Sequence, residues 1–128
     1  MIKINVQVNC NNAPKKEFIK NFNIAFATGN VASFLTHIDE NIQWTIHGDK
    51  TITGKKQFQD EIISMSAFTA DEITIENIIT HGAVAAVNGT FSINRKSYSF
   101  CDIYRFKSAG SLILKTIDSY LLGAKKSK

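Results

Sequence analysis

Residues 83–122, AVAAVNGTFSINRKSYSFCDIYRFKSAGSLILKTIDSYLL, decide the fold. Apolar and polar residues alternate along this stretch with the period of two that is typical of strands. Turn residues interrupt the alternation at residues 94–96 and again at 107–110. The pattern predicts an antiparallel meander of four strands, of which one ends at His81 and the others cover residues 83–93, 98–106 and 112–122.

The region before the meander has mainly helical spacing. Phe18, Phe22 and Phe26 are spaced by four, which predicts a helix that starts near Pro14 and ends at Gly29. A short second helix and a third helix follow from the same spacing. The second carries Val31, Phe34, Leu35 and Ile38, and the third follows Gly54 and carries Phe58, Ile62 and Met65.

Two further strands are expected outside the meander. Ile42, Trp44 and Ile46 alternate with polar residues, and a turn follows them at residues 48–50. Strict alternation over residues 2–10 predicts an extra N-terminal strand, which must pair with a sheet edge or with a partner subunit. The fold class is therefore α+β: a cone-shaped, curved antiparallel sheet wrapped around three N-terminal helices.

Composition excludes several classes of protein. The chain has 128 residues and ordinary hydrophobic content, so we expect one domain over residues 1–128. The net charge is +4, but three of these charges lie in a basic tail, residues 123–128, that we expect to be mobile. We therefore expect no nucleic-acid partner. No apolar run is long enough to span a membrane, no signal-peptide block begins the chain, and the two cysteines are far apart, so we expect a cytoplasmic location and no membrane partner.

The order and spacing of four segments resemble the nuclear transport factor 2-like superfamily. The segments are residues 44–48 (WTIHG), 54–58 (GKKQF), 100–106 (FCDIYRF) and 114–120 (LKTIDSY). The resemblance is strongest to the branch of polyketide-cyclase-like (SnoaL-like) and ketosteroid-isomerase-like proteins. It implies a cone with a ligand pocket and a homodimer that forms through the sheet. It leaves the function open, because this fold serves isomerases, cyclases, dehydratases and binding modules.

Asp102 is the first candidate catalytic residue. Alternation places it between Phe100 and Tyr104 on a face that is otherwise aromatic. Burial would raise its pKa, and a protonated carboxyl can donate a hydrogen bond to an enolate oxygen. The resemblance places Asp102 at the neutral aspartate of ketosteroid isomerase. A buried carboxyl with a purely structural role fits the same pattern.

Asp118 and His47 are the other candidate acid–base residues. Alternation over residues 112–122 puts Asp118 on an apolar face, and the adjacent strands would allow it to approach Asp102. Histidine is a common general base near neutral pH, but alternation turns His47 away from Trp44 and Ile46 unless a bulge redirects it.

Two positions depart from steroid isomerase. Ile46 lies near the position of its carboxylate base, and Phe22 stands where the resemblance places a catalytic tyrosine. We therefore do not expect authentic steroid isomerase activity. The cavity would instead be shaped by Phe22, Trp44, Ile46, Phe100, Tyr104 and Tyr120.

Two functions remain open from the sequence. One is a protein that binds a small apolar or aromatic molecule and catalyses isomerisation, cyclisation or dehydration next to a carbonyl. The other is a non-catalytic ligand-binding or dimerisation module. No nucleotide-binding motif is present, and the three histidines lack the spacing of zinc ligands, so we expect neither cofactor nor metal. An open pocket with an unpaired Asp102 would favour the first function.

Overall fold

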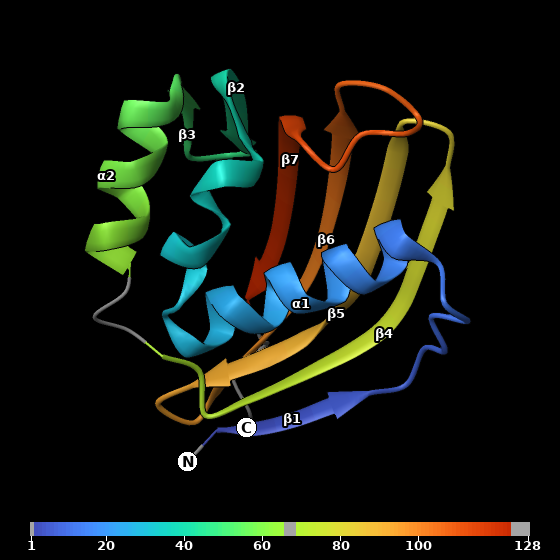
Figure 1. Cartoon of the computed structure of the whole chain (residues 1–128). Coiled ribbons are helices and arrows are strands. Elements are labelled where there is room, and N and C mark those ends of the chain that lie inside the picture. Colours follow the sequence, from blue (N-terminus) through green and yellow to red (C-terminus); the bar gives the residue numbers. More distant parts are fainter. Residues whose placement is uncertain (1, 66–68, 124–128) are drawn as a thin grey trace.

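The computed structural model describes residues 2–65 and 69–123, which form three helices and one seven-stranded sheet (Figure 1). The helices are α1 (Pro14–Thr28), the 3-10 helix η1 (Val31–His37) and α2 (Lys55–Met65). The strands are β1 (Lys3–Val6), β2 (Ile38–Ile46), β3 (Lys50–Thr53), β4 (Glu72–His81), β5 (Val84–Ile93), β6 (Lys96–Phe106) and β7 (Leu114–Gly123). Of the tail expected over residues 123–128, all but Gly123 lies outside the described residues.

The sheet has the order β1-β4-β5-β6-β7-β2-β3. Strands β4 to β7 form the expected antiparallel meander. The sheet is mixed and not antiparallel throughout as expected, because β1 pairs parallel with β4 and β2 pairs parallel with β7. Both parallel pairs join strands that are distant in the chain. Alternation within a strand indicates which face is covered, but it carries no information about the direction of a distant neighbour.

Three boundaries in the N-terminal half also differ from expectation. Ile38, assigned above to the second helix, is buried at the start of β2. The second helix is a short 3-10 helix. Strand β3 pairs antiparallel with β2 directly after the turn at residues 47–49, and the sequence indicated no strand there. With only four residues, β3 has too short a pattern to be separated from a turn.

Helix α1 begins and ends as the sequence predicts. Pro14 stands in its first turn, where the missing N–H is not needed. Gly29 ends the helix with a φ of +78°, the left-handed conformation that glycine adopts without strain. Phe18, Ile19 and Phe22 are buried, and the helix packs on β4 and β5, across the concave face of the sheet in Figure 1.

A close approach of backbones at Gly89 accompanies the curvature of the sheet. The register between β4 and β5 shifts between Ile75 and Asn77, opposite Gly89. A Cβ atom on Gly89 would lie 2.0 Å from the backbone oxygen of Thr74, so no other residue fits without movement of the backbone. Such irregularities bend a sheet and increase its twist, and here the bend forms one wall of the cone.

The extra N-terminal strand exists, but it is shorter than expected. Only Lys3–Val6 form β1, which pairs with the edge strand β4, as Figure 1 shows. The expectation of a strand over residues 2–10 is wrong for its second half. The last partner in the register is Ile75, and the irregularity of β4 that follows ends the pairing.

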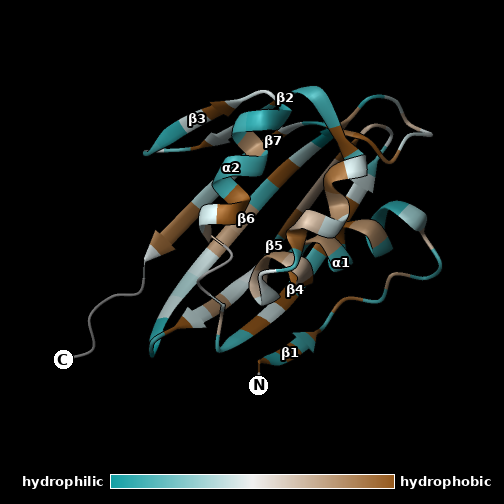
Figure 2. Ribbon diagram, turned by 60° about the vertical axis from the view of Figure 1, so that its left-hand side comes forward, coloured by the Kyte–Doolittle hydropathy of each residue, from teal (hydrophilic) through white to brown (hydrophobic). Residues whose placement is uncertain are grey.

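The sheet has an inner face that packs on the helices and an outer face that is open. In Figure 2, hydrophobic and hydrophilic residues alternate along the strands, as this division requires. Ile75, Val87, Tyr104 and Ile117 are buried on the inner face. Among the described residues, no helix is long and apolar enough to cross a membrane.

Candidate functional site

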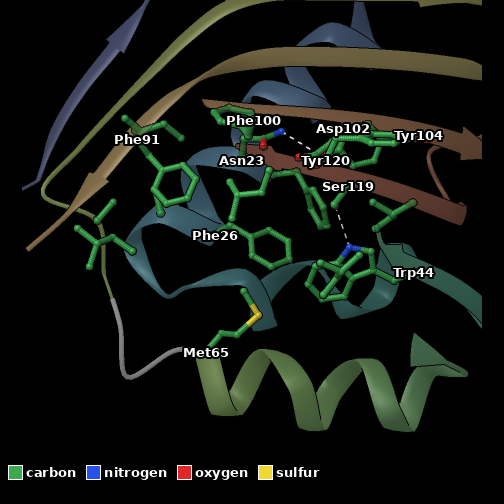
Figure 3. A pocket seen from close by; sticks show the side chains of 18 residues that line it. Asn23, Phe26, Trp44, Met65, Phe91, Phe100, Asp102, Tyr104, Ser119 and Tyr120 are labelled. Carbon is green, nitrogen blue, oxygen red and sulfur yellow. Dashed lines mark hydrogen bonds between the residues drawn. The ribbon is translucent and has the colours of Figure 1, made fainter. Parts of the chain in front are cut away.

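A cavity of about 340 Å³ lies between α1 and the inner face of the sheet (Figure 3). Small-molecule sites typically have volumes of about 300–1,000 Å³. Two of the residues that line it, Met65 and Leu121, are 37% and 51% exposed, so the cavity is not closed off from solvent. Aromatic side chains from helix and sheet line the cavity: Phe22, Phe26, Trp44, Phe91, Phe100, Tyr104 and Tyr120.

Asp102 is the only carboxylate among the described residues that line this cavity. It lies on β6 between the buried Phe100 and Tyr104, and the intervening Cys101 and Ile103 are exposed on the outer face, as alternation predicts. No ion pair to Asp102 is found in the described part of the chain. Burial raises the pKa of Asp102 to about 6, although hydrogen bonds from Ser119 and Tyr104 act in the opposite direction.

Tyr104 contacts Asp102 from the same strand. Its hydroxyl donates to Asp102 Oδ2 at 3.3 Å. The same hydroxyl accepts a hydrogen bond from Asn23 Nδ2 at 3.1 Å, and Asn23 also donates to the carbonyl of Ile19 at 2.9 Å. Asn23 is a buried polar residue on an otherwise apolar face of α1. Helix α1 therefore holds the tyrosine hydroxyl in place.

Ser119 contacts Asp102 from the neighbouring strand. The two residues are directly opposite in the β6–β7 register. The indole nitrogen of Trp44, on β2, donates to Ser119 Oγ at 2.9 Å, and Figure 3 marks this hydrogen bond with a dashed line. Three strands thus contribute to the surroundings of one carboxylate.

These hydrogen bonds change the expected role of Asp102. The expectation of a raised pKa is confirmed. A pKa of about 6 nevertheless leaves the carboxyl mainly ionised at pH 7, and the neighbouring hydroxyls donate to it. The geometry therefore favours a proton acceptor at neutral pH over the neutral donor that the resemblance implied.

Asp118 lies on the opposite face of the sheet from Asp102, contrary to expectation. The register shifts at the start of β7, where Arg105 is opposite Thr116 but Phe106 is opposite Leu114. Lys115 is the extra residue in β7, and each residue after it faces the side of the sheet opposite to the one that alternation predicts. Ile117 and Ser119 therefore face inward, and Asp118 is opposite the exposed Ile103.

His47 also lies on the outer face, where it meets Asp118. Its Nε2 is 2.9 Å from Asp118 Oδ1, and both side chains are more than one third exposed. The ring of Tyr120 stacks on His47 at a centroid distance of 4.2 Å. Tyr120 reaches the edge of the cavity, but neither His47 nor Asp118 lines it. The structure brings these two acid–base candidates together, away from Asp102.

The remaining sequence-predicted residues lie at the cavity. Phe22, Trp44, Ile46, Phe100 and Tyr104 all line it. Ile46 and Phe22, which the resemblance matched to the carboxylate and the tyrosine of steroid isomerase, present apolar groups to the cavity. Whether these residues contact a ligand stays a prediction.

Sequence reasoning missed Asn23 and Ser119. Asn23 had a usable signal, because it is a polar residue beside Phe22 on a stripe of buried apolar positions. Ser119 had none, because the bulge that turns it inward leaves no mark in the pattern. Within residues 2–65 and 69–123, no group of three or more His, Cys, Asp or Glu side chains could hold a metal ion.

Comparison with known proteins identifies one family. The family model described as the SnoaL-like domain matches residues 19–114, about three quarters of the chain. No curated protein matches the chain significantly.

Solved structures share the fold at low sequence identity. An NTF2-like protein of unknown function from Cytophaga hutchinsonii has 21% identity and a TM-score of 0.64, with 84% of this chain and 99% of that chain covered. An NTF-2 like protein of unknown function from Burkholderia xenovorans has 13% identity and a TM-score of 0.74, with 94% and 91% covered. The epoxide hydrolase/cyclase-like enzyme SalBIII, which acts in pyran ring formation in the polyether salinomycin, has 14% identity and a TM-score of 0.70, with 89% and 95% covered. The α+β cone fold of this superfamily is therefore confirmed.

Proposed function

This chain belongs to the SnoaL-like domain family, and we propose that its cavity binds a small, mostly apolar molecule and uses Asp102 to move protons on it. The observation that carries the proposal is a single carboxylate, with no ion-pair partner among the described residues, in an open and otherwise apolar cavity. A pKa of about 6 suits a group that must both take up and release protons near neutral pH.

The reaction class is proton transfer next to a carbonyl without a cofactor. Asp102 would take a proton from the carbon beside the carbonyl, and the electron pair of that C–H bond would move to the carbonyl oxygen. The protonated carboxyl would then return the proton to the oxygen or to another carbon. Asp118 and His47 take no part, because they lie on the other face of the sheet.

Isomerisation, cyclisation and dehydration all contain this step. The fold shared with an enzyme of pyran ring formation is compatible with cyclisation. Authentic steroid isomerase activity is disfavoured, because Ile46 and Phe22 present only carbon atoms to the cavity.

Exchange of the α-hydrogens of 2-tetralone tests this proposal. This ketone is an apolar bicyclic molecule, and Trp44, the only tryptophan, should report its binding by a change in fluorescence. In D₂O at pH 7, NMR should show faster hydrogen–deuterium exchange with the protein than without it. Asp102→Asn should abolish the acceleration but retain binding, and the matched control Asp118→Asn should retain both.

Two results would overturn the proposal. If 2-tetralone does not change the fluorescence of Trp44 at any concentration, the cavity is not a site for such molecules. If the ketone binds but exchange does not depend on Asp102, the catalytic part fails and the non-catalytic binding module is the correct function.

A second candidate function is assembly of two copies through the outer face of the sheet. Ile79, Ile103, Tyr120 and Leu122 are between 38% and 71% exposed on this face. Small uncharged residues, Ala86, Thr90 and Ser99, lie between them and leave a groove of about 450 Å³. Glu76 also lines this groove, and His47 pairs with Asp118 on the same face. A semi-apolar face with few charges can pack on an identical face.

Sedimentation of Ile103→Lys tests the dimer. The wild-type protein should sediment as a dimer at micromolar concentration. Ile103→Lys should sediment as a monomer, because a dimer of this variant would bury the charge of the lysine at its interface. Ile4→Lys, which changes an equally exposed isoleucine on the edge strand β1, should remain a dimer. A wild-type monomer would contradict this candidate.

The location of the protein also stays a proposal. We propose a cytoplasmic location, because Cys10 and Cys101 are both free and thiols stay reduced in the cytoplasm.

A further inference from the structure

The directions of the hydrogen bonds around Asp102 follow from groups that can only donate or only accept. The indole N–H of Trp44 has no lone pair to offer, so in its 2.9 Å contact with Ser119 Oγ the indole is the donor. The proton of the Ser119 hydroxyl is then free to point to Asp102, which it contacts across the β6–β7 pair.

A second chain of hydrogen bonds reaches Asp102 from α1. One N–H of the Asn23 amide donates to the carbonyl of Ile19, which fixes the orientation of the amide. Its other N–H donates to the Tyr104 hydroxyl, whose own proton goes to Asp102 Oδ2. This series of hydrogen bonds cannot reverse, because the backbone carbonyl at one end and the ionised carboxylate at the other only accept.

Both series of hydrogen bonds, from Trp44 and from Asn23, end at the carboxylate of Asp102. The side-chain donors of Asn23, Trp44, Tyr104 and Ser119 are all occupied. No Lys, Arg or His is found among the described residues that line the cavity. Asp102 retains unused lone pairs, because each oxygen of a carboxylate can accept two hydrogen bonds. Tyr120 carries the other side-chain donor among the described lining residues, and its ring stacks on His47 at the edge of the cavity. Around Asp102, the described part of the cavity therefore accepts hydrogen bonds from a ligand and donates none in its resting form.

We propose that the cavity selects ligands that carry one O–H or N–H donor on an apolar body, and that it discriminates against the matching ketone and acid. A ketone would bring an acceptor to a site without a free donor, and a carboxylic acid would bring a negative charge to Asp102 with no cation nearby. An alcohol or an ammonium group would instead complete the coordination of the carboxylate. This inference rests on the proposed function and specifies its ligand.

The inference also fits catalysis at the same site. The enol of a carbonyl compound carries an O–H that its ketone lacks. A cavity that binds the donor form more tightly favours the enol-like state over the ketone, which is the differential binding that lowers a barrier.

A series of ligands with one carbon skeleton tests the selectivity. The probes are tetralin, 2-tetralone, 2-tetralol, 2-aminotetralin and tetralin-2-carboxylic acid, each titrated against the fluorescence of Trp44 at pH 7. 2-Tetralol and 2-aminotetralin should bind about tenfold more tightly than tetralin, because hydrogen bonds to charged groups are stronger than those between neutral groups. 2-Tetralone should bind no better than tetralin, and the acid should bind least.

The pH dependence separates the two kinds of donor. At pH 7 the ammonium should bind more tightly than the alcohol, because the ionised carboxylate also attracts its charge. Protonation of Asp102 below pH 6 should remove this difference. Tyr104, Asn23 and Ser119 are the polar groups that face Asp102, and Cys101 lies on the other face. No second group that titrates between pH 5 and 8 faces it among the described residues.

Asp102→Asn and Asp118→Asn provide the matched pair of variants. Asp102→Asn should bind all the neutral probes within a few-fold of one another, whereas Asp118→Asn should keep the wild-type order. Equal binding of the ketone and the alcohol by the wild-type protein would overturn this inference, and the proposed apolar pocket would stand. Failure of tetralin itself to bind would overturn the proposed function instead.

Discussion

Strands β6 and β7 hold one aspartate on each face of the same sheet. Asp102 faces the cavity, where burial raises its pKa and two hydroxyls donate to it. Asp118 is only one strand away, on the outer face, where it is 39% exposed and contacts His47 at 2.9 Å. The two side chains have the same chemistry and similar sequence neighbours, and they differ only in which side of the sheet they face.

This difference shows that the face, and not the residue type, creates the candidate site. The inner face removes water and supplies a fixed set of donors, so its carboxylate becomes a proton acceptor of altered pKa. On the outer face water remains and a histidine is close, and for Asp118 a weak surface pair results. Substitutions at the bend, in the cavity and on the outer face should disturb this contrast to different degrees.

Gly89→Ala should have the largest effect, because it disturbs the bend that separates the two faces. The new Cβ would lie 2.0 Å from the backbone oxygen of Thr74, so β4 and β5 must move apart. We expect a loss of about 3 kcal/mol in the free energy of unfolding, measured by urea denaturation. Gly110→Ala is the control, because a Cβ there meets no atom within 4 Å. Equal effects of the two changes would show that the bend does not depend on Gly89.

Asp102→Asn should change how stability depends on pH. The pKa of Asp102 is about 6 in the folded protein against an ordinary value of 3.8, so between these values the folded state binds more protons than the unfolded state. The free energy of unfolding should therefore fall as pH rises from 4 to 7, by on the order of 2 kcal/mol, since solvent at the open end screens part of the charge.

The measurement is urea denaturation across this pH range. Asp102→Asn should lack the decrease, and Asp118→Asn should retain it. A wild-type protein whose stability does not change between pH 4 and 7 would contradict the burial of an ionised Asp102.

Ser119→Ala and Tyr104→Phe should raise the pKa of Asp102 further. Each variant removes one donor to the ionised carboxylate, and the Ser119 hydrogen bond has the larger influence of the two. Carboxyl titration by NMR should give the order Ser119→Ala, then Tyr104→Phe, then wild type. Each variant should also lose about 1.5 kcal/mol of stability at pH 7. A pKa that falls in either variant would mean that the hydroxyl does not donate to Asp102.

The strand meander and the aromatic inner face of β6 could be predicted from the sequence, because alternation of period two directly reports which residues face the core. The position of Asp102 follows from this alone. The same reasoning failed for Asp118, because one extra residue, Lys115, reverses the faces of β7. A bulge has no reliable signature in a single sequence. Partners such as Trp44 and Ser119 meet only after two strands distant in the chain pair in parallel.

The smallest expected effect lies on the outer face, in the pair formed by His47 and Asp118. Because both side chains are more than one third exposed, water competes for their contact and salt screens it. A double-mutant cycle with His47→Gln and Asp118→Asn should give a coupling energy of about 0.5 kcal/mol at pH 6, and less in high salt. The stacking of Tyr120 on His47 should persist in Asp118→Asn, because ring contact does not need the carboxylate. A coupling energy well above 1 kcal/mol would mean that something covers the pair and excludes water from it. The covering surface would then be the second copy proposed for the outer face, and Ile103→Lys should lower the coupling to the value expected for an exposed pair.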